Sequence, residues 1–292
     1  MSEEIAAIGV LYAPFLGGMM VGCFLFGITI SQAILYFRNY KDDALFLRAL
    51  VASALLIDTF HFVMVVDVVH IWYLFCKLPQ NYALLASFPW PLGASIIATY
   101  LITSMVQALY ILRVYMLSKN LWATGFISFL SLAQFGFGLF LWEDLFVANS
   151  LTALHGTKGQ VGGSVELAAT TLCDISISVA LWWYLHKGRT GFAKTEKMVD
   201  KLILYIVNLG LLTSAASLLT LILWLVMPSS FAFVSLTLIR SKLYCNAMLV
   251  TLNFRQTVRT ALHGNTTTGQ STTRVFQDID GVEMNSYKKS IP

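Results

Sequence analysis

Five polar side chains that could bind a ligand or carry a proton lie within otherwise apolar stretches of this 292-residue sequence. They are Asp58, His61, Asp174, Lys242 and Asn246. Helical periodicity places His61 one turn from Asp58 on the same face, and it places Asn246 one turn from Lys242. An ionisable side chain in the middle of a membrane costs about 2.5–3.5 kcal/mol or more, so each is a candidate functional group. The pattern permits two interpretations: a polar cavity open to the outside, or a network of ion pairs and hydrogen bonds that fixes helix packing.

The depth of the charged residues favours their mutual neutralisation. With a rise of about 1.5 Å per residue, Asp58 and Lys242 lie roughly 16 Å inside their predicted spans, and Asp174 and Arg240 lie roughly 13 Å inside. Arg240 and Lys242 are two positions apart, about 200° around a helix, so the two cations cannot face the same partner. Lys242 shares its face with Asn246, which makes Lys242 the inward-facing cation. We expect Arg240 to have a structural role, with its long side chain reaching outward.

The elements that must position these residues are membrane-spanning helices. Hydrophobic residues make up 57% of the sequence and charged residues 12%, whereas an average soluble domain carries about 25% charged residues. The apolar stretches between charged residues predict seven helices, over about 8–37, 46–74, 90–117, 121–146, 165–187, 201–227 and 231–254. A turn at 228–230 separates the last two. We therefore predict an all-α bundle of seven transmembrane helices over residues 1–259 and a disordered tail over 260–292.

The distribution of Lys and Arg predicts the orientation of the bundle. Three predicted loops and the tail carry most of these residues, whereas the opposite side carries Lys77 and Lys158. An excess of positive charge marks the cytosolic side, so the N-terminus is predicted outside and the C-terminus in the cytosol. The lipid bilayer is the first expected partner. The tail carries no retention signal, which favours the plasma membrane.

Other chemistries have less support in the sequence. A retinal Schiff base requires a lysine such as Lys242, but such pigments usually place an acidic counter-ion on the third helix, and the predicted third span has none. A zinc site needs several converging ligands, and the pairs Asp58/His61 and Asp67/His70 face opposite sides of the second helix. No nucleophile–base pair is evident. We expect no enzyme activity, no catalytic residue, no metal, no cofactor and no nucleic-acid partner.

Short polar and aromatic motifs recur in the predicted helices and beside them. They are Gln32 and Tyr36 followed by Asp42-Asp43; Asp58-Thr59 and His61; Gln107, Tyr110 and Arg113; Asp174 with Arg189-Thr190-Gly191-Phe192; Asn208 with Gly210-Leu211-Leu212-Thr213-Ser214; and Lys242-Leu243-Tyr244 with Asn246, Asn253 and Arg255. In this order they resemble a fungal, mainly basidiomycete, family of seven-span membrane proteins whose shared domain has no known function. The resemblance covers about residues 14–259. It implies a fungal membrane protein and supplies no ligand or catalytic residue.

Topology and buried charge together favour a receptor-like or sensory protein that takes a small ligand from the outside. Arg113 at the cytosolic end of the third helix, with Lys194 and Lys197 in the basic loop 187–201, would couple it to a cytosolic G protein. The same loop could instead bind lipid headgroups. Two alternatives stay open: a transporter or channel that uses the buried charges as a relay, and a structural membrane protein without a ligand.

Overall fold

The computed structural model describes the backbone of residues 2–77, 88–150, 154, 156–187, 193–227 and 232–263. It describes the side chains of residues 13–74, 88–150, 154, 156–187, 208, 210–227 and 232–254. These residues form seven α-helices and no β-strand. The helices are α1 (Ser2–Asn39), α2 (Leu45–Lys77), α3 (Trp90–Ser118), α4 (Leu121–Ala148), α5 (Thr157–Lys187), α6 (Ala193–Val226) and α7 (Ala232–His263). The predicted all-α class is confirmed for this part of the chain.

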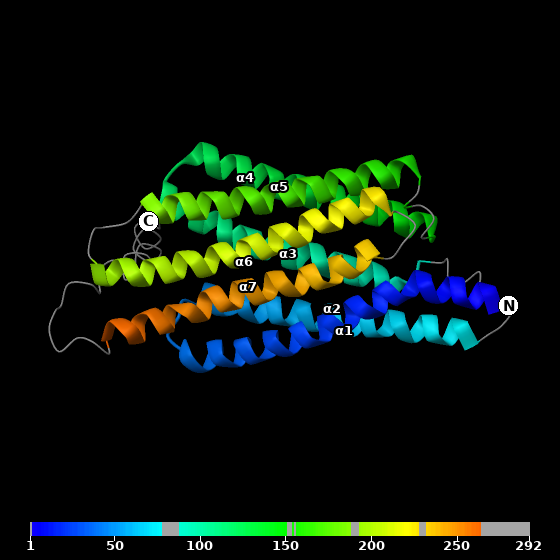
Figure 1. Cartoon of the computed structure of the whole chain (residues 1–292), viewed down its shortest axis with the longest axis horizontal. Helices are drawn as coiled ribbons and strands as arrows, with labels where there is room; N and C mark the ends of the chain where they lie inside the picture. Colours follow the sequence, from blue (N-terminus) through cyan, green and yellow to red (C-terminus); the bar gives the residue numbers. More distant parts are fainter. Residues whose placement is uncertain are drawn as a thin grey trace, which may run out of the picture.

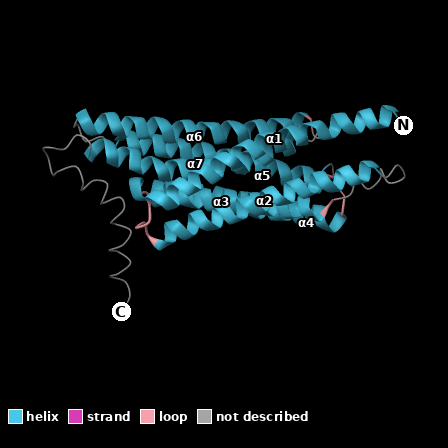
Figure 2. Cartoon of the chain, turned by 90° about the horizontal axis from the view of Figure 1, so that it is seen from below, coloured by secondary structure: helices cyan, strands magenta, loops and turns pink. Residues whose placement is uncertain are grey.

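The helices run along one common axis (Figure 1), and their contacts close a ring. Each helix contacts the next one in the chain, and α7 returns to contact α1. Two helices also make contacts across the ring: α3 touches α5 and α7, and α7 touches α2. Figure 2 shows the same bundle from below, with α6, α7 and α1 along one side. Polar residues on α3 and α7 are therefore well placed to reach several neighbours.

Six of the helices contain a segment that is long and apolar enough to cross a membrane, and in α6 the described apolar segment, Gly210–Val226, is shorter. The outer surface of the bundle carries large apolar side chains, such as Phe24, Trp122 and Leu132, which are 71%, 90% and 71% exposed. Such an apolar surface is unfavourable in water and favourable in lipid. A helix can cross lipid because its backbone polar groups form hydrogen bonds within the helix. The chain is a multi-pass, all-helical membrane protein.

The fifth helix begins earlier than predicted, and close packing explains the difference. Helix α5 begins at Thr157, whereas the predicted span begins at residue 165, because a glycine-rich segment is a poor helix former. In the bundle these glycines allow close contact. A Cβ atom on Gly163 would lie 2.6 Å from Cζ2 of Trp224, and one on Gly162 would lie 3.3 Å from a ring carbon of Phe140. Helix contact outweighs intrinsic propensity here.

Two predictions for the opposite end of the bundle are wrong. The prediction of a loop over 187–201 fails because α6 begins at Ala193, which places Lys194 and Lys197 on a helix. No proline or glycine interrupts residues 193–209, so the segment can continue the helix. The prediction of disorder from residue 260 fails at its start, because α7 continues to His263. The rest of the predicted tail and the predicted turn at 228–230 lie outside the described residues.

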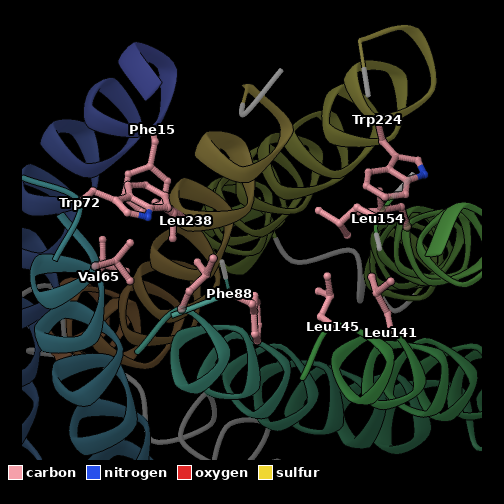
Figure 3. Close-up of a cluster of buried hydrophobic side chains, with 12 residues drawn as sticks. Phe15, Val65, Trp72, Phe88, Leu141, Leu145, Leu154, Trp224 and Leu238 are labelled. Atoms are coloured by element: carbon pink, nitrogen blue, oxygen red, sulfur yellow. The ribbon is translucent and has the colours of Figure 1, made fainter. Parts of the chain in front are cut away.

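Apolar side chains fill both ends of the bundle. We call the end where α1, α3, α5 and α7 begin the N-end, and the other the C-end. At the N-end, all seven helices contribute to one buried cluster that includes Phe15, Trp72, Trp224 and Leu238 (Figure 3). Phe15 and Trp72 pack edge to face with ring centroids 4.8 Å apart. Two more clusters fill the C-end half, one on α1, α2, α3 and α7 and one on α3, α4 and α5. The buried charges lie between these apolar regions.

Gly18 packs closely against α7 and provides a test of the packing. A Cβ atom at this position would lie 2.7 Å from Cα of Ser235, and backbone cannot move aside as a side chain can. We predict that Gly18→Ala lowers the free energy of unfolding by about 1–3 kcal/mol. Gly17→Ala is the matched control, because its Cβ would meet nothing within 4 Å. Thermal unfolding in detergent compares them, and equal stability of the two variants would contradict this contact.

Candidate functional site

Four polar residues of α7, Arg240, Lys242, Tyr244 and Asn246, hold the centre of the bundle together. Residues two positions apart point about 200° away from each other, so Arg240 and Tyr244 share one face while Lys242 and Asn246 share the opposite one. The first face meets α5. The second face meets α1 and α2. Helix α7 therefore directs buried polar contacts to both sides of the ring.

Lys242 and Asp58 form a buried ion pair between α7 and α2. Nζ of Lys242 donates to Oδ1 of Asp58 at 2.6 Å and to the Asp58 backbone carbonyl at 3.0 Å. The two side chains are 2% and 0% exposed. Nζ also lies 5.0 Å from the ring centroid of Phe26 and 5.9 Å from that of Phe62. The carboxylate and the aromatic faces together stabilise the ammonium group away from water.

His61, one turn from Asp58, lines a small cavity. His61 is buried one helical turn from Asp58. Within the described part of the chain, no group bonds to Oδ2 of Asp58 or to either ring nitrogen of His61. The cavity between α1, α2 and α7 is lined by Gly18, Met19, Gly22, His61, Phe62, Val65, Leu238 and Lys242. It has room for about one water molecule. Buried polar atoms without a hydrogen-bond partner therefore lie close to both a cavity and an ion pair.

Arg240 pairs with Glu166 of α5, on the other side of α7. Nη2 of Arg240 lies 3.5 Å from Oε1 of Glu166, and the side chains are 1% and 7% exposed. The hydroxyl of Thr170 donates to the same carboxylate oxygen at 3.1 Å. The prediction that Arg240 reaches outward is wrong, because Glu166 supplies a counter-charge inside the bundle. The prediction that Arg240 and Lys242 face different partners is confirmed.

Asp174 lies in a separate polar network that joins most of the helices. Nε2 of Gln107 on α3 donates to Oδ1 of Asp174 at 3.1 Å. Oγ of Ser217 on α6 donates to Oδ2 at 2.8 Å, and the Tyr244 hydroxyl donates to the same oxygen. None of the ion pairs between described residues includes Asp174. Three neutral donors, rather than a cation, surround this carboxylate.

The amide of Gln107 extends the Asp174 network to α4. Gln107 and Gln134 exchange hydrogen bonds through their side-chain amides. Oγ of Ser131 donates to Oε1 of Gln107 at 2.8 Å. Since Gln107 also bonds Asp174, the network connects α4 with α3, α5, α6 and α7. A glutamine amide has donors and an acceptor, so it can serve both neighbours at once.

The five predicted site residues therefore lie in two places. His61 and Lys242 line the small cavity and Asp58 pairs with Lys242, whereas Asp174 belongs to the network on the far side of α7. Asn246 lies one turn from Lys242, where its amide donates to the backbone carbonyl of Leu25 on α1 at 3.0 Å. Within the described part of the chain, no three His, Cys, Asp or Glu side chains come close enough to hold a metal ion together.

The three predicted coupling residues lie near the C-end. Arg113 has its guanidinium carbon 5.7 Å from the ring centroid of Tyr110, one turn earlier on α3. The backbone of Lys194 and Lys197 lies at the start of α6, and their side chains lie outside the described ones. The end of α3 and the start of α6, which carry these three residues, therefore lie at the same end of the bundle.

The buried charged and hydrogen-bonded side chains at the centre of the bundle form a polar layer. Sequence reasoning did not identify Glu166, or the neutral partners Gln107, Gln134 and Ser217, as members of this layer. The late predicted start of the fifth helix placed Glu166 at the edge of a span. Helical spacing carried a usable signal, because Glu166 and Asp174 lie two four-residue steps apart on one face of a helix. Neutral residues gave no comparable signal, since a single glutamine or serine in an apolar helix fits many positions.

Comparison with known proteins adds a family but no activity. Residues 170–257 match a family of unknown function, DUF6534. The matched segment contains Asp174, Arg240, Lys242 and Asn246, but it does not include Asp58 or α2. No curated protein and no solved structure matches the chain. The similarity thus covers the α5–α7 side of the polar layer, and the fungal origin stays a prediction.

The glutamine pair provides a test of the polar network. We predict that Gln107→Leu lowers the free energy of unfolding by about 1–3 kcal/mol for each buried partner that it leaves unsatisfied. The double variant Gln107→Leu/Gln134→Leu should recover part of this loss, because the second change removes one of the orphaned amides. Thermal unfolding of the wild type, Gln107→Leu, Gln134→Leu and the double variant measures the coupling. Simple addition of the two single effects would show that the amides do not interact.

Proposed function

We propose that the chain is a receptor-like or sensory membrane protein that binds a small extracellular ligand between α1, α2 and α7. The observation that supports this proposal best is a set of buried polar atoms without a described partner: both ring nitrogens of His61, which lines the cavity, and Oδ2 of Asp58, which is one turn away on α2. A buried polar atom without a partner costs about 1–3 kcal/mol. A ligand that donates to Asp58 and bonds to His61 would remove that cost, which favours binding.

The chemistry of the cavity defines the class of ligand. Its walls are mostly apolar, with contributions from Met19, Phe62 and Leu238. Its polar groups are His61 and Lys242, and Lys242 is paired with Asp58. The proposed ligand is therefore mainly apolar and carries at least one hydrogen-bond donor. Because the cavity has room for about one water molecule, α1, α2 and α7 would have to separate to admit such a ligand. Gly22 lines the cavity, and a Cβ atom on this residue would meet nothing within 4 Å.

Helix α7 would carry the effect of the ligand toward the cytosol. Lys242 faces the cavity, and Tyr244, two residues later on the other face, bonds Asp174. A ligand that shifts Lys242 would therefore also change the hydrogen bonds of the Asp174 network. At the C-end, the proposed contact surface for a cytosolic partner such as a G protein includes Arg113, Lys194 and Lys197. The chain acts, in this proposal, without catalysis.

The proposal includes seven membrane spans with the N-terminus outside and the C-terminus in the cytosol. Six helices qualify by length and composition, and α6 packs between α5 and α7 in the same ring. The excess of Lys and Arg in the segments at the C-end supports a cytosolic C-end. The same orientation places the cavity beside α1 and α2 on the extracellular side of the buried charges, as a receptor in the plasma membrane requires.

A transporter is the second candidate, and the positions of two cavities favour it. The cavity beside Lys242 extends from the polar layer toward the N-end, through Gly18, Val65 and Leu238. A second small cavity beside Asp174 extends toward the C-end, through Leu181 and Gly210. Two cavities on opposite sides of a charged layer are what alternating access to a central site would need.

Native and denaturing intact mass of the protein purified from its own membrane tests the ligand. We expect the wild type to retain a small molecule in the native spectrum and to lose it on denaturation. Gly22→Leu should abolish retention, because its side chain fills the cavity, whereas Gly17→Leu on the exposed side of α1 should not. A mass increase that survives denaturation and maps to Lys242 would point to a Schiff-base pigment instead.

Two outcomes of this measurement would contradict the receptor proposal. One is a wild-type protein with no bound molecule, which would favour the structural interpretation of the buried charges. The other is a bound molecule that also crosses the membrane of proteoliposomes, with flux abolished by Asp58→Asn, which would favour the transporter. Retention of the molecule in the Gly22→Leu variant would show that it binds elsewhere.

A further inference from the structure

The buried charges do not balance in the described part of the chain. Three acids are buried there, Asp58, Glu166 and Asp174, but only two bases, Lys242 and Arg240. Asp58 is paired with Lys242, and Glu166 with Arg240. His61 is buried beside the first of these pairs and on the other side of α7 from Asp174. One negative charge therefore remains, and its position is the Asp174 carboxylate.

The hydrogen bonds of Asp174 fit an ionised carboxylate. Both of its oxygens accept: Oδ1 accepts from the Gln107 amide, and Oδ2 accepts from Ser217 and Tyr244. None of these bonds requires Asp174 to donate. A carboxylate in this state needs a counter-charge, because an isolated charge in an apolar interior is strongly unfavourable.

The hydroxyl groups that line the cavity beside Asp174 act mainly as acceptors, because most of their hydrogens are donated elsewhere. Its polar lining consists of Gln107, Tyr110, Asp174, Ser178, Thr213 and Tyr244. The Ser178 hydroxyl donates its hydrogen to the Asp174 backbone carbonyl at 2.8 Å, and the Thr213 hydroxyl donates to the Gly210 carbonyl at 3.0 Å. The Tyr244 hydrogen goes to Asp174 itself. Because these hydrogens are committed, the hydroxyl groups can present only lone pairs to an occupant of the cavity.

We propose that this cavity is a sodium-binding site formed by the Asp174 carboxylate and the hydroxyl oxygens of Ser178, Thr213 and Tyr244. Hard cations prefer oxygen ligands, and a single carboxylate balances a single positive charge, so a monovalent cation fits better than Mg²⁺ or Ca²⁺. The cavity has room for about one water molecule, and a dehydrated sodium ion needs less space than that. The site is on the other side of α7 from the cavity proposed for the extracellular ligand.

Sodium would tighten the packing of four helices. Its proposed ligands come from α5, α6 and α7, and Gln107 of α3 bonds the same carboxylate. An ion that binds only the folded bundle stabilises it by an amount that grows with the logarithm of the ion concentration above the Kd. The site would therefore respond to sodium concentration at the C-end, from which its cavity extends.

Thermal unfolding at constant ionic strength tests the site. The purified wild-type protein in detergent at neutral pH is measured as choline chloride is replaced stepwise by sodium chloride. We expect the apparent Tm to rise by about 3–6 °C over the full replacement of choline by sodium. Asp174→Asn should abolish the rise. Asp67→Asn is the matched control, because Asp67 is a partly exposed acid on α2 that pairs with His70 at 3.9 Å, and it should keep the full response.

A second variant and a direct measurement keep the test decisive if Asp174→Asn does not fold. Thr213→Val preserves the shape of the side chain and removes one oxygen, so we expect about a tenfold higher sodium concentration at half saturation. Broadening of the ²³Na NMR line by the wild-type protein, reversed by excess sodium, would support direct binding.

Three results would overturn the proposal. The first is an equal rise of the apparent Tm in choline chloride and sodium chloride. The second is a sodium response that persists unchanged in folded Asp174→Asn and in Thr213→Val. The third is an infrared band of a protonated carboxylic acid that disappears in Asp174→Asn and is present in wild type at saturating sodium, which would make a proton the occupant.

Discussion

Helix α7 carries two cations into an apolar interior, and the rest of the bundle must place an acid beside each one. Arg240 and Lys242 lie on opposite faces of α7, so a single acid cannot serve both. Glu166 on α5 meets Arg240, and Asp58 on α2 meets Lys242. Breaking a buried pair leaves one uncompensated charge and costs about 3–5 kcal/mol. This requirement fixes the rotation of α7 and the depths of α2 and α5 relative to it.

The position of the polar layer follows from the same requirement. The charges lie in the middle of the bundle, and apolar clusters fill the space toward the N-end and the C-end. The N-end cluster separates the Arg240–Glu166 pair from that end, since Leu167 and Leu238, next to these residues, belong to it. Cavities beside the layer are therefore small. Any molecule that reaches the buried charges passes between helices whose packing those charges determine.

Much of this arrangement could be predicted from the sequence because charges in apolar helices are rare and costly. The helix count and the opposite directions of Arg240 and Lys242 follow from periodicity and depth. The expected neutralisation of Asp174 by a base is wrong, because Arg240 pairs with Glu166 and Lys242 pairs with Asp58. The partner of Arg240 could not be assigned, because glycines near Gly163 concealed the first turns of α5 and put Glu166 at a span end. Only the structure shows that these glycines admit Trp224 and extend the helix.

The division of the candidate site into two parts also required the structure. Asp58 and Asp174 are alike in sequence, since each is an acid inside an otherwise apolar stretch of a helix. Their difference lies in their neighbours: a lysine for Asp58, and an amide and two hydroxyl groups for Asp174. Neutral partners on α3, α6 and α7 reach Asp174 through tertiary packing, which helical periodicity within one segment cannot indicate.

Double-mutant cycles between the four paired charges measure the central claim directly. The neutral variants are Asp58→Asn, Glu166→Gln, Arg240→Met and Lys242→Met, combined in all four acid–base pairs. The structure predicts coupling of about 1–3 kcal/mol for Asp58 with Lys242 and for Glu166 with Arg240. It predicts coupling within about 0.5 kcal/mol of zero for the two crossed combinations. Equal coupling in the crossed combinations, or none in the matched ones, would contradict separate pairing on the two faces of α7.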